Sequence, residues 1–213
     1  IFDMHFPDAL TALDVTYGKG RFWQELPNLT VTGVDIDPQR PDDIRADYRD
    51  LPQFLFAVDQ DGHPSFDVLA FDPMFLFSAG IRRTMGTKRF FRADAEQAAI
   101  LAKPRNPADL LEHYRAIFQQ APQLARLGLI VKGQDLIVSN YRDMWMWHVM
   151  DLAKEAGYGQ PTDYLIQVSP ASRMRDPRWK QQYFFRTANC YYLVYRFGKG
   201  RCIRPGQQSG SGP

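Results

Sequence analysis

The run Phe66–Phe71 constrains the fold of this chain more than any other feature, because it is apolar along nearly its whole length. A strand of this kind is typical of the centre of a parallel sheet, where helices cover both faces. Strand-like and helix-like segments alternate along the rest of the chain. We therefore predict an α/β fold with helices on both faces of a mostly parallel sheet.

Seven segments have the composition and length of strands. They are Ala12–Val15, Leu29–Val34, Ile44–Asp47, Phe66–Phe71, Gly128–Lys132, Tyr164–Val168 and Asn189–Phe197. Helices are predicted at Gly20–Leu26, Pro107–Leu127 and Asp143–Ala156. The segment Ser169–Thr187 lacks a convincing crossover helix, so the last two strands are predicted to be antiparallel. The sheet should then contain one reversed strand.

The length of the chain favours one domain. Its 213 residues and 24.6 kDa suffice for one well-buried domain and are short for two. We expect this domain to span residues 1–204. Residues 76–106 form a long irregular stretch inside it, and such stretches are usually functional or disordered. Residues 205–213 contain only Gly, Ser, Gln and Pro, and we expect a tail that is disordered or was added by cloning.

Composition narrows the class of protein further. The net charge of +2 gives only faint support for an anionic partner. The two cysteines are too few for a disulfide framework, so a cytoplasmic setting is expected. No apolar run reaches the roughly 18 residues of a membrane span, and we expect no membrane association. The four histidines are scattered without metal-ligand spacing, and we expect no metal.

A glycine loop follows the first predicted strand. Gly18 and Gly20 fit a tight turn in which glycine is needed for positive φ or for contact between a ligand and the backbone. Asp35 ends the next strand, where a carboxylate can bind both hydroxyls of a ribose. The alternative is that Asp14, Asp35 and Asp37 only end strands and cap helices.

A nicotinamide-dependent dehydrogenase would share this layout, but it expects a third glycine three residues after the second. Trp23 occupies that position. Lys19 does not complete a phosphate loop either, because the Gly-x-x-x-x-Gly-Lys spacing is absent. The loop therefore favours a ligand without phosphates.

Five segments match, in order and at workable spacing, the motifs of one family. They are Asp14–Trp23, Gly33–Pro38, Arg45–Tyr48, Phe71–Phe75 and Asn189–Tyr195. The chain resembles class I S-adenosylmethionine-dependent methyltransferases, specifically those that methylate amino groups in nucleic acids, such as DNA adenine methyltransferases. The resemblance implies a Rossmann-like methyltransferase fold, in which a seven-stranded, mostly parallel sheet has a reversed last strand.

The resemblance also implies S-adenosyl-L-methionine as cofactor. The residues expected to bind it are Asp14, Thr16, Tyr17, Gly18, Gly20, Asp35, Ile36, Asp47 and Tyr48. The catalytic residues implied are Asp72, Pro73 and Phe75, although Met74 stands where the family normally has a second proline.

The chemistry of these three residues suits an exocyclic base amine, whose lone pair is delocalised into the ring. The Asp72 carboxylate and the Pro73 carbonyl can accept the two N–H bonds and draw the nitrogen toward tetrahedral geometry. The Phe75 ring can stack on the base. Most of the catalysis then comes from holding the amine in line with the methyl group of the donor.

Basic residues mixed with aromatic residues suggest where a nucleic acid would bind. The candidates are Arg82, Arg83, Lys88, Arg89, Arg173, Arg175 and Lys180. The alternative is that they belong to solvated loops whose aromatic side chains enter the core.

Our leading hypothesis is a methyltransferase that acts on adenine in DNA, because the catalytic motif begins with Asp. An RNA base methyltransferase, a catalytically degenerate nucleic-acid-binding subunit and a small-molecule methyltransferase remain alternatives. The loop 76–106 is the only room for target recognition, so recognition of a short site or help from a protein partner is expected.

Overall fold

The computed structural model describes residues 1–73, 104, 106–134, 136–138, 141–168 and 189–198. Its helices are α1 (Phe2–His5), α3 (Pro107–Leu124) and α4 (Trp145–Glu155), and its 3₁₀ turns are η1 (Arg21–Trp23) and η2 (Gln53–Phe56). The strands are β1 (Thr11–Asp14), β2 (Thr30–Asp35), β3 (Ile44–Arg45), β4 (Phe66–Phe71), β5 (Ala125–Gly133), β6 (Leu136–Val138), β7 (Tyr141–Asp143), β8 (Asp163–Val168) and β9 (Asn189–Arg196).

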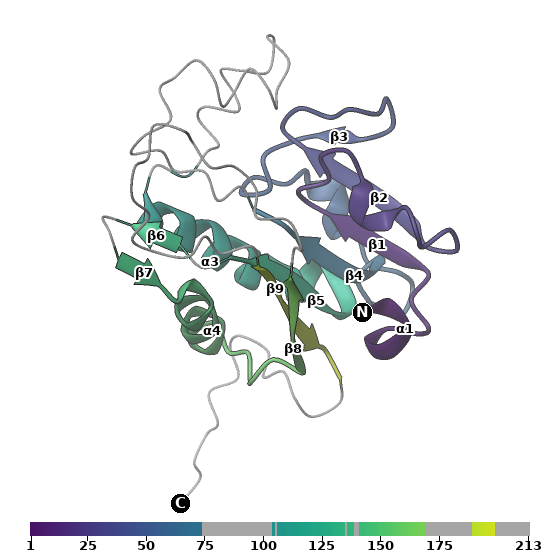
Figure 1. Ribbon diagram of the computed structural model, residues 1–213. Coiled ribbons are helices and arrows are strands. Elements are labelled where there is room, and N and C mark those ends of the chain that lie inside the picture. Colours follow the sequence, from purple (N-terminus) through teal and green to yellow (C-terminus); the bar gives the residue numbers. More distant parts are fainter. Residues whose placement is uncertain (74–103, 105, 135, 139–140, 169–188, 199–213) are drawn as a thin grey trace, which may run out of the picture.

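Seven of these strands form one sheet in the order β3-β2-β1-β4-β5-β9-β8 (Figure 1). The pairs from β3 to β5 are all parallel, and β9 is antiparallel to both of its neighbours. This arrangement confirms the predicted Rossmann-like sheet with a reversed last strand. The strands β6 and β7 form a separate hairpin.

The central strand β4 is buried on both faces, as its sequence predicts. Leu69 belongs to a core that includes the buried sides of α3 and α4. Val68 points to the other face, where it joins a smaller core with residues of α1 and η1. In Figure 1, α1 and the first strands lie at one side of the molecule, and α4 and the β6–β7 hairpin lie at the other.

Helix α3 begins where its sequence predicts. The Asn106 side chain accepts a hydrogen bond from the Asp109 backbone N–H at 2.9 Å, and Pro107 opens the first turn. The helix ends at Leu124 rather than Leu127, because Ala125 is already extended and begins β5. No helix in the described part of the chain combines the length and apolarity needed to cross a bilayer.

The predicted helix Gly20–Leu26 is wrong, since only the single 3₁₀ turn η1 forms there. The short segment 21–29 must carry the chain from Gly20 to β2, and Pro27 disfavours helical continuation. In addition, the Trp23 indole is buried and donates a hydrogen bond to Asp14, which fixes the turn against the end of β1. The β6–β7 hairpin was not predicted, and its second strand delays the start of α4 from Asp143 to Trp145.

A buried carboxylate clamps the amino ends of the central strands. Asp67 of β4 accepts hydrogen bonds from the backbone N–H groups of Leu10 and Thr11, at 2.7 and 3.0 Å, and from the Arg126 guanidinium of β5. Burial alone would raise the pKa of Asp67, but these hydrogen bonds hold its pKa below the ordinary value.

We expect Asp67→Asn to lower the free energy of unfolding at pH 7 by about 1.5–3 kcal/mol, because a charge-assisted bond is lost and an amide N–H then faces other donors. A depressed pKa contributes stability above the unfolded-state value, which is about 3.9, and that stability is lost as pH falls through the folded-state pKa. Urea titrations should therefore show the two proteins converging at low pH. Asp8→Asn, an exposed carboxylate before β1, is the control and should behave as wild type at every pH.

Candidate functional site

The carboxyl ends of three adjacent parallel strands bring three acidic residues to one edge of the sheet. In the register of β1, Asp14 lies opposite Gly33 of β2 and Ala70 of β4. Asp14 ends β1, Asp35 ends β2, and Asp72 follows β4. Ligands of open α/β sheets bind at such an edge, so this is the candidate site.

Asp14 is an internal anchor of this edge. Only 6% of its surface is exposed, and it accepts hydrogen bonds from the Trp23 indole N–H at 2.7 Å and from the backbone N–H and hydroxyl of Thr16 at 2.9 and 3.2 Å. Burial raises the pKa of Asp14 to about 6, although the hydrogen bonds oppose that shift. Its carboxylate therefore holds the loop and the 3₁₀ turn in place.

The hydroxyl of Thr16 joins the glycine loop to the segment after β4. While it donates to Asp14, it accepts a hydrogen bond from the Asp72 backbone N–H at 2.7 Å. Asp72 of the predicted catalytic motif and Thr16 of the predicted cofactor motif are therefore in direct contact.

The two glycines of the loop have different roles. Gly20 has φ +64°, and a side chain there would collide with the buried Tyr17 ring, so this glycine is required for packing. Gly18 has φ +55°, and among the described residues other than its two neighbours in the chain, only the Thr16 carbonyl lies within 4 Å of the place where a Cβ would stand. A ligand can therefore approach the backbone at Gly18.

Asp35 fixes the other side of the loop. Its carboxylate accepts hydrogen bonds from the backbone N–H groups of Gly18 and Asp37, each at 2.8 Å. It is partly exposed, as is the following Ile36. Arg40 lies over the Tyr17 ring at 4.1 Å from its centroid and adds a cation–π contact beneath the loop.

Asp47 and Tyr48 follow β3 and lie in a separate network. Asp47 pairs with Arg49 at 2.5 Å. The Tyr48 hydroxyl lies 2.5 Å from Nδ1 of the buried His113, its ring packs edge-on against Phe71, and Arg49 lies 3.3 Å from Nε2 of the same histidine. Burial lowers the pKa of His113, and Arg49 lowers it further. These contacts direct the Tyr48 hydroxyl into the protein.

Asp72 forms an ion pair that the sequence analysis missed. Its Oδ2 lies 2.5 Å from Nζ of Lys132 on β5, and 46% of the Asp72 side chain is exposed. Burial raises the pKa of Asp72, and although Lys132 opposes this shift, the pKa remains above its ordinary value. Pro73 is buried beside it. The sequence places Lys132 at the end of the predicted fifth strand, but its pairing with Asp72 depends on the register of β4 and β5.

The remaining predicted site residues lie outside the described residues. They are Phe75 and the basic residues Arg82, Arg83, Lys88, Arg89, Arg173, Arg175 and Lys180. In the described ranges, no group of three or more His, Cys, Asp or Glu side chains is arranged to hold a metal ion.

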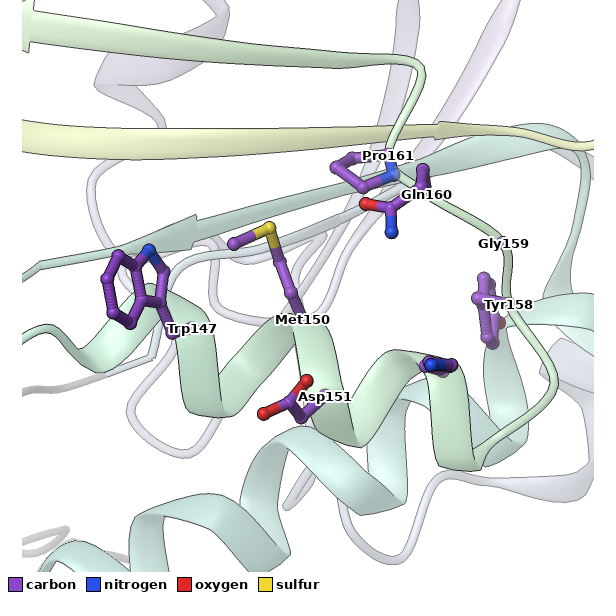
Figure 2. Close-up of a pocket in the computed structure, with 8 residues that line it drawn as sticks. Trp147, Met150, Asp151, Tyr158, Gly159, Gln160 and Pro161 are labelled. Atoms are coloured by element: carbon purple, nitrogen blue, oxygen red, sulfur yellow. The ribbon is translucent and has the colours of Figure 1, made fainter.

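A pocket of about 450 Å³ lies apart from this edge, between α4 and the segment that leads into β8 (Figure 2). Figure 2 shows Trp147 and Met150 of α4 on one side, with Gln160 and Pro161 on the other. Because β8 runs in the same direction as β4, this segment lies toward the amino ends of the parallel strands. None of the predicted site residues lines the pocket.

The Asp14–Trp23 bond yields a pH-dependent prediction. Trp23→Phe removes the indole N–H, which raises the folded-state pKa of Asp14 beyond about 6. An acid whose pKa is raised by folding destabilises the folded state as pH rises through that range. We expect the variant to lose about 1.5–3 kcal/mol at pH 8 and less at pH 5, where Asp14 is largely protonated.

Urea denaturation at both pH values measures this difference. Trp147→Phe, the same change at an exposed indole, is the matched control. An equal loss at both pH values in Trp23→Phe would show that packing of the ring, and not its bond to the carboxylate, is what matters.

The sequence matches no known family profile and no curated protein. Nine chains of solved structures match its fold. The S-adenosylmethionine-dependent methyltransferase SibL, in its apo form, is 13% identical over 91% of this chain and 52% of that chain, with a TM-score of 0.43. A protein of Thermus thermophilus named as a DNA modification methylase is 13% identical over 76% of this chain and 54% of that chain, with a TM-score of 0.38. This chain thus spans about half the length of each of these two structures.

Proposed function

We propose that this protein is an S-adenosylmethionine-dependent methyltransferase that acts on an exocyclic amine of a nucleobase, with adenine in DNA as the favoured target. The observation that carries the proposal is the hydrogen bond from the Asp72 backbone N–H to the Thr16 hydroxyl, at 2.7 Å. This hydrogen bond joins Asp72, which is suited to bind an amine, to the glycine loop, which is suited to bind a nucleoside.

The residues at the carboxyl edge fit the cofactor. S-adenosylmethionine would supply an electrophilic methyl group on a sulfonium. The open backbone at Gly18 offers a surface for it, and the partly exposed Asp35 carboxylate can accept hydrogen bonds from ribose hydroxyls. Asp14 acts indirectly by holding Thr16 and Trp23, and Asp47 and Tyr48 are proposed to flank the adenine.

Asp72 is suited to bind the target amine. Lys132 engages its Oδ2, and no described residue donates a hydrogen bond to its Oδ1. That oxygen can accept one amine N–H, and the Pro73 carbonyl is proposed to accept the other. Removal of one preorganised donor from an oxyanion hole typically costs a factor of about 10²–10³ in rate, and we expect this preorganised acceptor to be worth a similar factor. We propose that Phe75 stacks on the base.

A nucleic-acid substrate would require the basic residues of the segments 76–106 and 169–187 to neutralise phosphates. The affinity for oligonucleotides should then fall steeply between low and moderate salt, because bound counterions are released on binding. A small-molecule methyltransferase would show no such dependence.

A catalytically degenerate nucleic-acid-binding subunit is the second candidate. One feature favours it: Met74 replaces the second proline of the motif. Such a protein would bind oligonucleotides without binding S-adenosylmethionine or transferring methyl groups.

We expect Asp72→Asn to reduce methyl transfer by about 10²–10³-fold while the affinity for S-adenosylhomocysteine stays within twofold. Transfer of tritiated methyl groups to DNA and to RNA, followed in parallel with calorimetry, measures both quantities. Asp8→Asn, which removes an exposed carboxylate far from the carboxyl edge, should match wild type. Equal transfer by wild type and Asp72→Asn would remove Asp72 from the mechanism.

We expect Asp35→Ala to weaken binding of S-adenosylhomocysteine by about tenfold or more, because hydrogen bonds from hydroxyls to a carboxylate are each worth about 1.5–3 kcal/mol. Calorimetry gives the dissociation constant, and a thermal melt shows whether the glycine loop is disturbed through its lost bond to Asp35. An unchanged dissociation constant in a folded variant would place the ribose elsewhere.

A further inference from the structure

The sheet places Lys132 beside Asp72. Phe71 of β4 lies opposite Val131 of β5 in parallel register, so the two next residues are neighbours at the carboxyl edge. The Nζ–Oδ2 distance is 2.5 Å, and 23% of the Lys132 side chain is exposed. Both side chains are therefore partly exposed at the carboxyl edge.

We propose that Lys132 is a positioning residue, which holds Asp72 as a carboxylate by one oxygen and leaves the other oxygen for the target amine. The role of the amine in this proposal rests on the proposed function. The ion pair between Lys132 and Asp72 does not depend on that function.

The charges around Asp72 show why a cation is needed there. The titratable groups that interact with it are Asp14 on β1, Tyr114 on α3, Lys132 on β5 and Tyr192 on β9. Among the residues that the structure describes, Lys132 is the cation that contacts Asp72, and burial and the nearby Asp14 carboxylate both act against a second negative charge. Without Lys132, the pKa of Asp72 would rise further.

Lys132 is itself held firmly. Its backbone carbonyl accepts a hydrogen bond from the buried Tyr114 hydroxyl at 2.9 Å, and its neighbour across the strands is Tyr192 of β9. The Tyr192 hydroxyl donates to the Gln167 side chain at 2.8 Å and so does not compete for the Asp72 carboxylate. Burial alone would lower the pKa of Lys132, but Asp72 raises it, so the amine remains a cation.

The charge on Asp72 matters during the transfer. As the N–C bond forms and the C–S bond breaks, positive charge develops on the amine nitrogen and the donor becomes a neutral thioether. The free oxygen of Asp72 offsets that charge through its hydrogen bond, and the nitrogen then loses one proton to solvent. A protonated Asp72 would present a weaker acceptor or a donor.

Three variants test this role. Lys132→Met keeps the length of the side chain and removes its charge, Lys132→Arg keeps the charge, and Lys154→Met removes an exposed cation of α4 as a control. Nuclear magnetic resonance of the carboxyl carbons, with Asp72→Asn used to assign the signal, gives the pKa of Asp72. We expect Lys132→Met to raise this pKa by about one unit or more, and the other two variants to leave it near wild type.

Enzyme kinetics supply the second measurement. The acid limb of the pH–rate profile should move upward by the same amount in Lys132→Met, because Asp72 must be ionised to act. On the acid limb kcat should fall about tenfold for each unit by which the pKa of Asp72 rises, with the affinity for S-adenosylhomocysteine unchanged, and Lys132→Arg should recover most of kcat. A variant that was merely less stable would lose amplitude without a shift of the acid limb.

Each outcome separates the two proposals. An unshifted Asp72 pKa in Lys132→Met overturns the role of Lys132, whether or not the wild type transfers methyl groups. A shifted pKa in a protein that methylates neither DNA nor RNA supports the hold of Lys132 on Asp72 and rejects the proposed reaction. A shifted pKa with an unmoved acid limb shows that the charge of Asp72 does not limit the reaction, and overturns the positioning role.

Discussion

The buried carboxylate of Asp14 is the constraint on which the whole carboxyl edge depends. It ends β1 and gathers three hydrogen bonds, from the Trp23 indole and from the backbone and hydroxyl of Thr16. Burial of a carboxylate is unfavourable, and these three donors compensate for only part of that cost. The pKa of Asp14 therefore remains raised. A change in the shape of the loop that removed any one of these donors would leave the Asp14 charge poorly satisfied. The short loop therefore keeps its shape.

The contacts beyond Asp14 extend that constraint across the sheet. Thr16 receives the Asp72 backbone N–H, and Lys132 on the next strand donates to the Asp72 carboxylate. The position of the proposed catalytic acid is thus fixed through its main chain by the loop after β1 and through its side chain by β5. The strands β1 and β5 both pair with β4, which places these two supports at the same edge of the sheet.

The sequence predicted the strands of the main sheet and the reversed last strand, because apolar runs and the lack of a crossover before β9 are local signals. The prediction from sequence was wrong or incomplete where the structure depends on contacts between residues that are far apart along the chain. The segment after Gly20 reads as a helix, yet Trp23 turns inward to Asp14 and the segment 21–29 is too short for a stable helix. The three acids at the edge could be named from their positions after strands. The pairing of Lys132 with Asp72 follows from the β4–β5 register, which no local pattern contains.

Three contacts within the chain hold the glycine loop: Tyr17 packs against Gly20, Arg40 stacks on Tyr17, and Asp35 accepts the Gly18 N–H. A loop that is ordered by folding does not have to be ordered again on association, so little entropy is lost there when a small molecule arrives. For the proposed cofactor, affinity would then be governed by desolvation and hydrogen-bond exchange at Asp35. The dissociation rate should therefore respond more strongly to substitutions at this carboxylate than to changes in loop flexibility.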